Sequence, residues 1–404
     1  MSRTSLPMHD APPLSVAGGP AVLAKGFRPF FLAAALYVGL ALPLWSLVLA
    51  GRVVAPFYVD PVTWHAHEMV FGFGVAVVAG FLLTAVGNWT QSETATGAPL
   101  AGLLVLWLAG RLAMLFSDRL PRPLVASVDV LFVPALALVL ARPIVRAKNR
   151  RNYAVVVALV ALTGANVMVH LDALGLLPAM RRRALLVSVD VIVFFLVLVT
   201  GRVVAMFTKN ATRDAGCKSH PRVELLAVVA TATLVVGDAA GGAPSAVRAA
   251  TFAVAAGVVA ARAVHWGALS SFRDPMLWVL HVGHAFLPLG LALRAIAEVV
   301  PAVPSSLGVH AITAGAIGAL CIGMMARVSL GHTGRAIAAP RGMALAFGLV
   351  VVSALVRMGA AVAPVGVALP LLVSGSLGLS FAFVAYAVVF ARILTTPRAD
   401  GKAG

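Results

Sequence analysis

About twelve long apolar stretches limit the fold of this chain more than any other feature of its sequence. Each is close to the roughly 20 residues with which an α-helix crosses the hydrocarbon core of a bilayer. Loops of about four to sixteen residues, marked by Pro, Gly and charges, separate them. The expected spans are 30–49, 65–87, 99–116, 124–141, 153–172, 185–206, 223–240, 247–266, 277–297, 306–327, 342–363 and 366–391, and the pair at 223–266 has the weakest boundaries. The sequence predicts an all-α, polytopic membrane helical bundle.

Composition excludes a soluble protein. Of 404 residues, 61% are hydrophobic and only 11% are charged, and the mean hydropathy is +0.99. A globular core of this size cannot hide that much apolar surface from water. We expect a polar N-terminal tail over residues 1–25, one transmembrane domain over 26–395 and a C-terminal tail over 396–404, with the first span retained rather than cleaved as a signal peptide.

The formal charge of +17 does not indicate nucleic-acid binding, since no basic domain with interleaved aromatic residues accompanies it. If both termini are cytoplasmic, the cytoplasmic segments hold about 18 Lys and Arg and the opposite side about six, which follows the positive-inside rule. Arg181, Arg182 and Arg183 fall on the wrong side in this orientation. The expected location is a bacterial inner membrane, with the lipid bilayer as the surroundings of the bundle.

Ionisable residues inside apolar spans mark functional sites by default, because a charge is costly to keep there. Glu68 follows two histidines at the start of the second span, and Asp129, Asp190 and Asp238 lie within later spans. Interhelical ion pairs that fix the packing are the plainer interpretation of these acids. A proton path is the alternative. Glu68 can relay protons or orient an imidazole through its second ring nitrogen.

Eight of the ten histidines lie in spans or at span ends, which favours metal binding in a chain with so few polar residues. His281 and His284 are three residues apart, so both can face one centre from one side of a helix. His65 and His67 are about 200° apart around a regular helix and should not share a metal. The direction of the spans then suggests an outer cluster of His65, His67 and His310, joined by His170, and an inner cluster of His281, His284, His332 and His265.

Cysteines, arginines and glycines of the sequence limit the kinds of cofactor that the protein can bind. Two cysteines are too few for a disulfide framework or an iron–sulfur cluster, and no C-x-x-C-H motif attaches a haem covalently. Arg28, at the start of the first span, can reach lipid headgroups or pair with a carboxylate such as a propionate. Glycines of the second and tenth spans leave smooth helix faces, which suit close helix packing first and a flat macrocycle second.

Several motifs occur together in a fixed order. They are G-F-R-P-F-F at 26–31, W-H-A-H-E-M at 64–69, G-F-L-L-T-A at 80–85, H-V-G-H-A-F at 281–286 and R-V-S-L-G-H-T-G-R at 327–335. Together they resemble the NnrS family over about residues 25–395. The resemblance implies a bacterial inner-membrane protein of twelve helices that carries haem b and copper and is associated with denitrification and nitric oxide tolerance. It puts metal ligands among His65, His67, His281, His284, His310 and His332, and cofactor contacts at Arg28, Trp64, Arg327 and Arg335.

The expected function is therefore resistance to nitric oxide and nitrosative stress through histidine-ligated haem and copper. A redox enzyme acting on nitric oxide is one alternative, with Glu68 as a catalytic proton carrier and an unidentified electron donor. A transporter or metal-handling protein, with the histidines as a path for copper or a small molecule, is the other. A transporter of this kind need not absorb visible light as a haem protein does.

Overall fold

The computed structural model describes residues 19–55, 57–214 and 216–402. Its first half contains α1 (Phe27–Leu49), α2 (Pro61–His67), the π-helix η2 (Glu68–Gly74), α3 (Val75–Thr90), α4 (Gly97–Leu115), α5 (Arg122–Val130), α6 (Phe132–Arg146), α7 (Tyr153–Ala173) and α8 (Arg181–Thr212). The second half contains α9 (Pro221–Ala240), α10 (Ser245–Ala261), α11 (Ala268–Ser271), α12 (Pro275–Val299), α13 (Ser305–His310), the π-helix η4 (Ala311–Ile317), α14 (Gly318–His332), α15 (Met343–Ala360) and α16 (Val365–Thr395). Short 3-10 turns, η1 (Ala21–Leu23) and η3 (Arg150–Asn152), complete the list.

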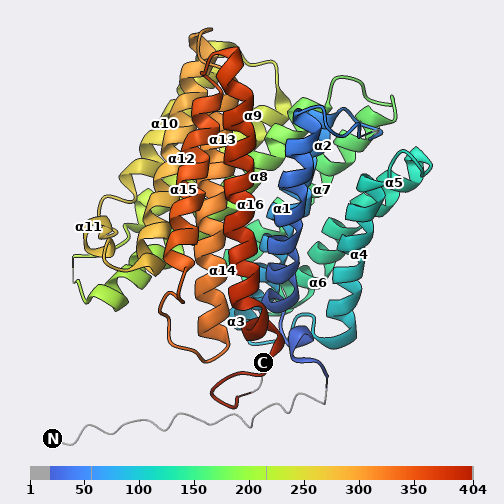
Figure 1. Ribbon diagram of the computed structural model, residues 1–404. Coiled ribbons are helices and arrows are strands. Elements are labelled where there is room, and N and C mark those ends of the chain that lie inside the picture. The colour runs from blue at the N-terminus through green and yellow to red at the C-terminus, as the bar shows by residue number, and fades with distance from the viewer. Residues whose placement is uncertain (1–18, 56, 215, 403–404) are drawn as a thin grey trace, which may run out of the picture.

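The helices lie side by side as one bundle of long rods (Figure 1). Eleven helical segments of the described chain are long and apolar enough to cross a membrane. A further, shorter apolar helix, α10, has 17 residues, a length at the short end of what a bilayer requires. The predicted all-α, multi-pass membrane fold is confirmed, and the predicted weak boundary at 223–266 is where this short helix lies.

Two spans form the centre of the bundle. The segment Pro61–Thr90, made of α2, η2 and α3, has 78% of its apolar window buried, and the segment Ser305–His332, made of α13, η4 and α14, has 83%. Most of the other spans bury less than half of theirs. These two central segments carry four of the six histidines predicted as ligands. His67 is fully buried, and His65, His310 and His332 are half-buried.

Both central segments contain one π-helical turn, and each turn directly follows a predicted ligand. η2 begins one residue after His67, and η4 begins one residue after His310. π-Helical turns are rare and are found often at functional sites, because the extra residue redirects the side chains around it. The two interruptions therefore single out the same two histidine regions as the sequence motifs.

Glycines in these segments serve close packing. A Cβ atom at Gly72 would lie 2.4 Å from the ring of Tyr37, and one at Gly315 would lie 2.5 Å from the ring of Phe286. At both positions an aromatic side chain occupies the space over the helix backbone. This is the first of the two uses predicted for the glycines.

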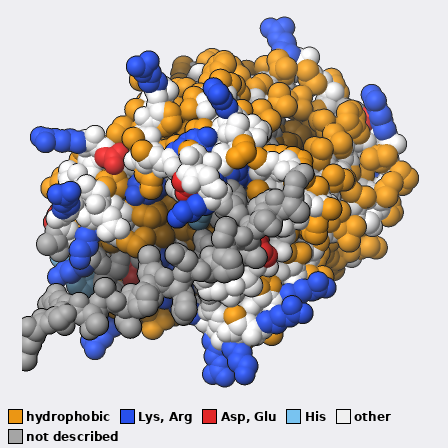
Figure 2. All heavy atoms as spheres, turned by 90° about the horizontal axis from the view of Figure 1, so that it is seen from below, with side chains coloured by type: hydrophobic (Ala, Val, Ile, Leu, Met, Phe, Trp, Pro, Cys, Tyr) orange, Lys and Arg blue, Asp and Glu red, His pale blue; other side chains and the backbone are white. Residues whose placement is uncertain are grey.

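The two ends of the bundle differ from its flank. Figure 2, seen from the end near the C-terminal residues, shows Lys and Arg side chains projecting around that end and hydrophobic side chains over the flank. An apolar flank between charged ends suits a bilayer. Which end faces the cytoplasm stays a prediction.

Asp60 caps the first central segment at the opposite end. Its carboxylate accepts hydrogen bonds from the backbone N–H of Thr63 at 2.9 Å and from the Thr63 hydroxyl at 2.6 Å, and it pairs with Arg181 at 3.1 Å. Burial on its own raises the pKa of Asp60, but the hydrogen bonds from Thr63 and Arg181 outweigh it and hold the pKa below the ordinary 3.8.

We expect Asp60→Ala to lower the free energy of unfolding by about 1 kcal/mol, because the first turn of α2 loses its cap. Asp60→Asn is the matched control, since asparagine caps nearly as well. The pKa of Asp60 is lowered by folding, so its contribution is complete above about pH 5 and is lost as the pH falls below about 4. Thermal unfolding in detergent at several pH values measures both effects; an alanine variant as stable as the asparagine variant at neutral pH would contradict the capping role.

Candidate functional site

A buried network of polar side chains surrounds His67 between the first central segment, α4, α5 and α7. The Nδ1 atom of His67 lies 2.9 Å from Oε1 of Glu68, and its Nε2 atom lies 2.9 Å from Oδ1 of Asn166. Arg111 donates to Glu68 at 2.7 Å and also to Asp129. All five side chains are almost completely shielded from solvent.

Hydrogen-bond geometry fixes the protonation of His67. Asn166 donates its Nδ2 to Asp129 at 2.9 Å, so its oxygen is the atom that faces His67. Both ring nitrogens of His67 thus point at oxygen acceptors, and both carry a proton when Glu68 is ionised. The charges of His67 and Arg111 then balance those of Glu68 and Asp129, which is how a low-dielectric interior tolerates four ionised groups.

His170 extends the network towards one end of the bundle. Its Nε2 donates to Asp129 at 2.8 Å, and Tyr58 contacts its Nδ1. Burial, together with the charge of Asp129, raises the pKa of Tyr58, so its phenol remains protonated and donates to the ring. At the other limit the Tyr37 hydroxyl bonds to Glu68. An unbroken series of hydrogen bonds therefore joins Tyr58 to Tyr37, as a proton path requires.

One group of three side chains that could bind a metal ion (His, Cys, Asp or Glu) occurs among the described residues. It consists of His67, Asp129 and His170, whose ligand atoms all lie within 4.8 Å of one another. Their donors and acceptors are nevertheless occupied by each other and by Asn166 and Arg111. A metal there has to displace a proton from His67 and compete with Arg111 for Asp129. The arrangement fits an ion-pair and proton network better than it fits a metal centre.

His65 points away from this network, as expected for residues two apart. Its ring stacks on Trp45, with centroids 4.4 Å apart and an interplanar angle of 12°. Its Nδ1 is buried and has no hydrogen-bond partner among the described residues. His310 and Arg357 are close enough to interact with it electrostatically. His65 therefore lies in the neighbourhood of His310, and Glu68 contacts His67.

His310 is anchored through one nitrogen only. Its Nδ1 donates to the backbone oxygen of Ser306 at 2.8 Å, which leaves the lone pair on Nε2. Metal-ligating histidines are typically held in this way, with the second ring nitrogen donating to a carbonyl and the first turned to the metal. The predicted pairing of His65 with His310 at one end of the bundle is therefore compatible with a ligand pair.

The histidines of α12 show the same arrangement. The Nε2 atom of His284 donates to the backbone oxygen of Val259 at 3.1 Å, while its buried Nδ1 has no partner in the described chain. The Nε2 atom of His281 lies 2.9 Å from the hydroxyl of Thr208. That hydroxyl gives its own proton to Val204, so it accepts from His281 and leaves Nδ1 of this ring unprotonated.

His332 lies apart from the α12 pair, at the end of α14. Its ring packs against Phe27, with centroids 5.7 Å apart. It lines a cavity of about 130 Å³ together with Asn88, Trp89 and Arg202. This is below the roughly 300 Å³ of ordinary ligand pockets, so a haem beside His332 requires the surrounding side chains to separate. The structure does not bring His281, His284 and His332 within ligand distance of one common point.

The four residues predicted to contact a cofactor have protein partners. Arg28 donates to the backbone oxygens of Leu394 and Thr396 at 3.1 and 2.7 Å. Arg335 lies 3.3 Å from the backbone oxygen of Thr333. Trp64 stacks on Phe57, with centroids 4.3 Å apart, and Arg327 covers the ring of Phe207 at 4.0 Å. Arg28 thus ties the start of α1 to the end of α16.

Sequence reasoning did not single out Tyr37, Tyr58 or Asn166. Their signal was weak, because a single tyrosine or asparagine in an apolar run is common. The remaining predicted member of the inner cluster, His265, packs against His220, with ring centroids 5.1 Å apart, rather than against the pair on α12.

Comparison with known proteins identifies the family. No curated protein sequence matches the chain. The profile described as NnrS protein matches residues 21–398, nearly the whole chain. The match includes every helix described above, both π-helical turns and all six histidines predicted as ligands. This multi-pass membrane protein belongs to the NnrS family.

Proposed function

We propose that the protein binds nitric oxide at histidine-ligated metal centres, haem b and copper, in a bacterial inner membrane and thereby gives resistance to nitrosative stress. Family membership supports the connection with nitric oxide and denitrification. The eleven long apolar helices support the lipid bilayer as its setting. Turnover of nitric oxide would further need an electron donor and protons.

One observation carries the metal proposal. His281, His284 and His310 each donate one ring N–H to an oxygen, and the lone pair of the other nitrogen has no hydrogen-bond donor in the described chain. Of these three free nitrogens, Nδ1 of His284 is buried, and leaving a buried polar atom without a partner is unfavourable. A metal ion would supply the missing partner of His284.

The positions of the histidines suggest which of them would bind copper and which would bind haem. His65 and His310 would hold copper, for which imidazole is a suitable ligand. His281 or His284 would ligate the haem iron; neither of them lines the small cavity beside His332. When bound, an imidazole-ligated iron with an open position supplies the nitric oxide site. Glu68 and Asp129 keep protons on His67, so the network can store a proton close to His65.

The test compares metal contents of purified variants. His284→Ala is expected to lose most of its iron and His310→Ala most of its copper, because each loses an anchored ligand. His220→Ala is the matched control, since His220 is exposed and lies outside the spans. Iron and copper are measured by elemental analysis after purification in detergent. Contents equal to the control in both variants would contradict the assignment.

A further inference from the structure

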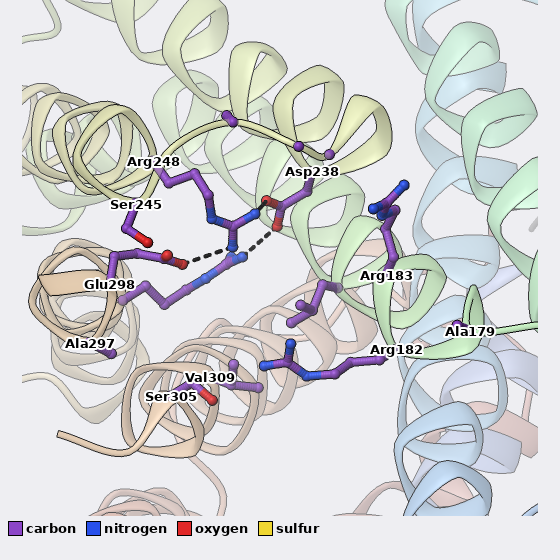
Figure 3. Close-up of a pocket in the computed structure, with 15 residues that line it drawn as sticks. Ala179, Arg182, Arg183, Asp238, Ser245, Arg248, Ala297, Glu298, Ser305 and Val309 are labelled. Carbon is purple, nitrogen blue, oxygen red and sulfur yellow. Dashed lines mark hydrogen bonds and ion pairs between the residues drawn. The ribbon is translucent and has the colours of Figure 1, made fainter. Parts of the chain in front are cut away.

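A large polar cavity lies at the end of the bundle opposite the C-terminal residues. Its volume is about 620 Å³, within the range of ordinary small-molecule sites. It is enclosed by the start of α8, the end of α9, the start of α10, the end of α12 and the start of α13 (Figure 3). Its lining includes four arginines and two acids: Arg182, Arg183, Arg248, Arg294, Asp238 and Glu298.

Both acids of the lining are already paired. Arg248 lies 2.8 Å from Glu298 and 3.3 Å from Asp238, and Arg294 lies 2.7 Å from Asp238. Arg294 also pairs with the buried Asp190 behind the cavity. Figure 3 draws some of these contacts as dashed lines. They pair both carboxylates of the lining with Arg248 and Arg294 and stabilise one wall of the cavity.

Arg182 and Arg183 have no such partner. Neither side chain makes a hydrogen bond or ion pair with any residue that the structure describes. Figure 3 shows the guanidinium of Arg182 extending from α8 into the cavity towards the side where Val309 lies. Gly241 makes room for the other arginine, since a Cβ atom there would lie 2.4 Å from the Cζ atom of Arg183. The lining therefore carries two guanidinium charges that no carboxylate neutralises.

Two helix starts add to the positive potential. α8 and α10 both begin at the cavity rim, neither has a side-chain cap, and neither has an acid in its first turn. The partial positive charge of a helix N-terminus favours anions. Ser245, the first residue of α10, lines the cavity, and its hydroxyl makes no hydrogen bond to the described residues. It is available as a neutral donor on the side of the cavity where Arg248 and Glu298 lie (Figure 3).

We propose that this cavity is a binding site for a small oxyanion, held by Arg182, with Arg183 adding to the positive charge of the lining. A planar guanidinium such as that of Arg182 donates two parallel hydrogen bonds to an oxyanion. The site also explains an anomaly of the sequence. In the predicted orientation these arginines lie on the side where the positive-inside rule expects few cations, and an anion there would compensate their charge. Free inorganic phosphate and the phosphate of an anionic lipid headgroup share the required chemistry.

The first arm of the test uses inorganic phosphate and full-length protein in detergent, with ionic strength held constant by chloride. Phosphate is expected to raise the melting temperature in a saturable way. In an Arg182→Gln/Arg183→Gln variant the apparent affinity should fall at least about tenfold, and in an Arg182→Lys/Arg183→Lys variant it should fall less. Arg122→Gln is the matched control, an exposed arginine at the start of α5 that does not line this cavity.

The second arm distinguishes the lipid source. Protein in nanodiscs of phosphatidylcholine is compared with protein in nanodiscs that also contain phosphatidylglycerol. A stabilisation by phosphatidylglycerol that disappears in the double glutamine variant assigns the site to headgroups, and one by free phosphate assigns it to a soluble anion. If neither probe distinguishes the double glutamine variant from Arg122→Gln, the proposal is wrong. Metal content is not involved, so this outcome is independent of the proposed function.

Discussion

Asp129→Ala is expected to lower the free energy of unfolding by about 3–5 kcal/mol, the usual cost of removing one member of a buried ion pair. Asp129, a buried residue of α5, accepts hydrogen bonds from Arg111 of α4 and from Asn166 and His170 of α7. Its loss leaves Arg111 with only Glu68 and gives the network an unbalanced positive charge. Thermal and denaturant unfolding of the purified variant in detergent measure the change.

Asp118→Ala is the matched control for this prediction. Asp118 is exposed and lies 3.8 Å from the exposed Arg119, and such surface pairs contribute little. We expect its effect to stay within about 0.5 kcal/mol. The loss of stability for Asp129→Asn should lie between those of Asp129→Ala and Asp118→Ala, because asparagine keeps a hydrogen-bonding oxygen but loses the charge. A loss for Asp129→Ala no larger than for Asp118→Ala would show that the network is not the ionised arrangement described.

Gly308→Ala is expected to destabilise the protein by about 1–3 kcal/mol, the cost of overfilling a close-packed interior. A Cβ atom at Gly308 would lie 2.8 Å from both the backbone nitrogen of Arg294 and the backbone oxygen of Gly290. Backbone atoms cannot rotate away as a side chain can, so α12 and α13 have to move apart. His310 lies two residues further on, so copper content should fall together with stability.

Gly348→Ala is the control, and we expect it to stabilise the protein. Gly348 lies within α15, and a Cβ atom there would meet nothing within 4 Å. Alanine has less backbone freedom than glycine in the unfolded chain and loses less of it on folding, which favours the helix by roughly 0.5–1 kcal/mol. Melting temperatures of the two variants should therefore move in opposite directions from that of the wild type. Equal shifts would mean that the close crossing of α12 and α13 does not exist.

Most of the fold could be predicted from the sequence, because span length and apolar composition are local properties. The four aspartates and glutamates within spans were also recognisable as buried charges. Their partners were not: Asn166 is 99 residues from His67, and Asp190 is 104 residues from Arg294. These contacts depend on which helices pack against each other. The spacing of apolar residues says little about helix packing when a helix is hydrophobic on most sides.

An irregular helix explains a second contact that could not be predicted from the sequence. A regular helix places Glu68 on the same face as His65, yet the structure pairs Glu68 with His67 and Arg111. The helix changes to π geometry at Glu68, and the added residue in that turn alters every facing relation around it. A similar lesson comes from Arg181, which looked misplaced as an isolated charge. It pairs with Asp60 and Asp172 at 3.1 and 2.5 Å.

The most direct test of the metal-centre proposal is the absorption spectrum of the purified wild-type protein, oxidised and reduced, before and after addition of nitric oxide. Iron and copper analysis of the same sample accompanies it. We predict the bands of a non-covalently bound b-type haem, a shift of those bands with nitric oxide, and bound copper. A colourless protein with neither metal, purified from cells supplied with iron and copper, would contradict the proposal and favour a transport role.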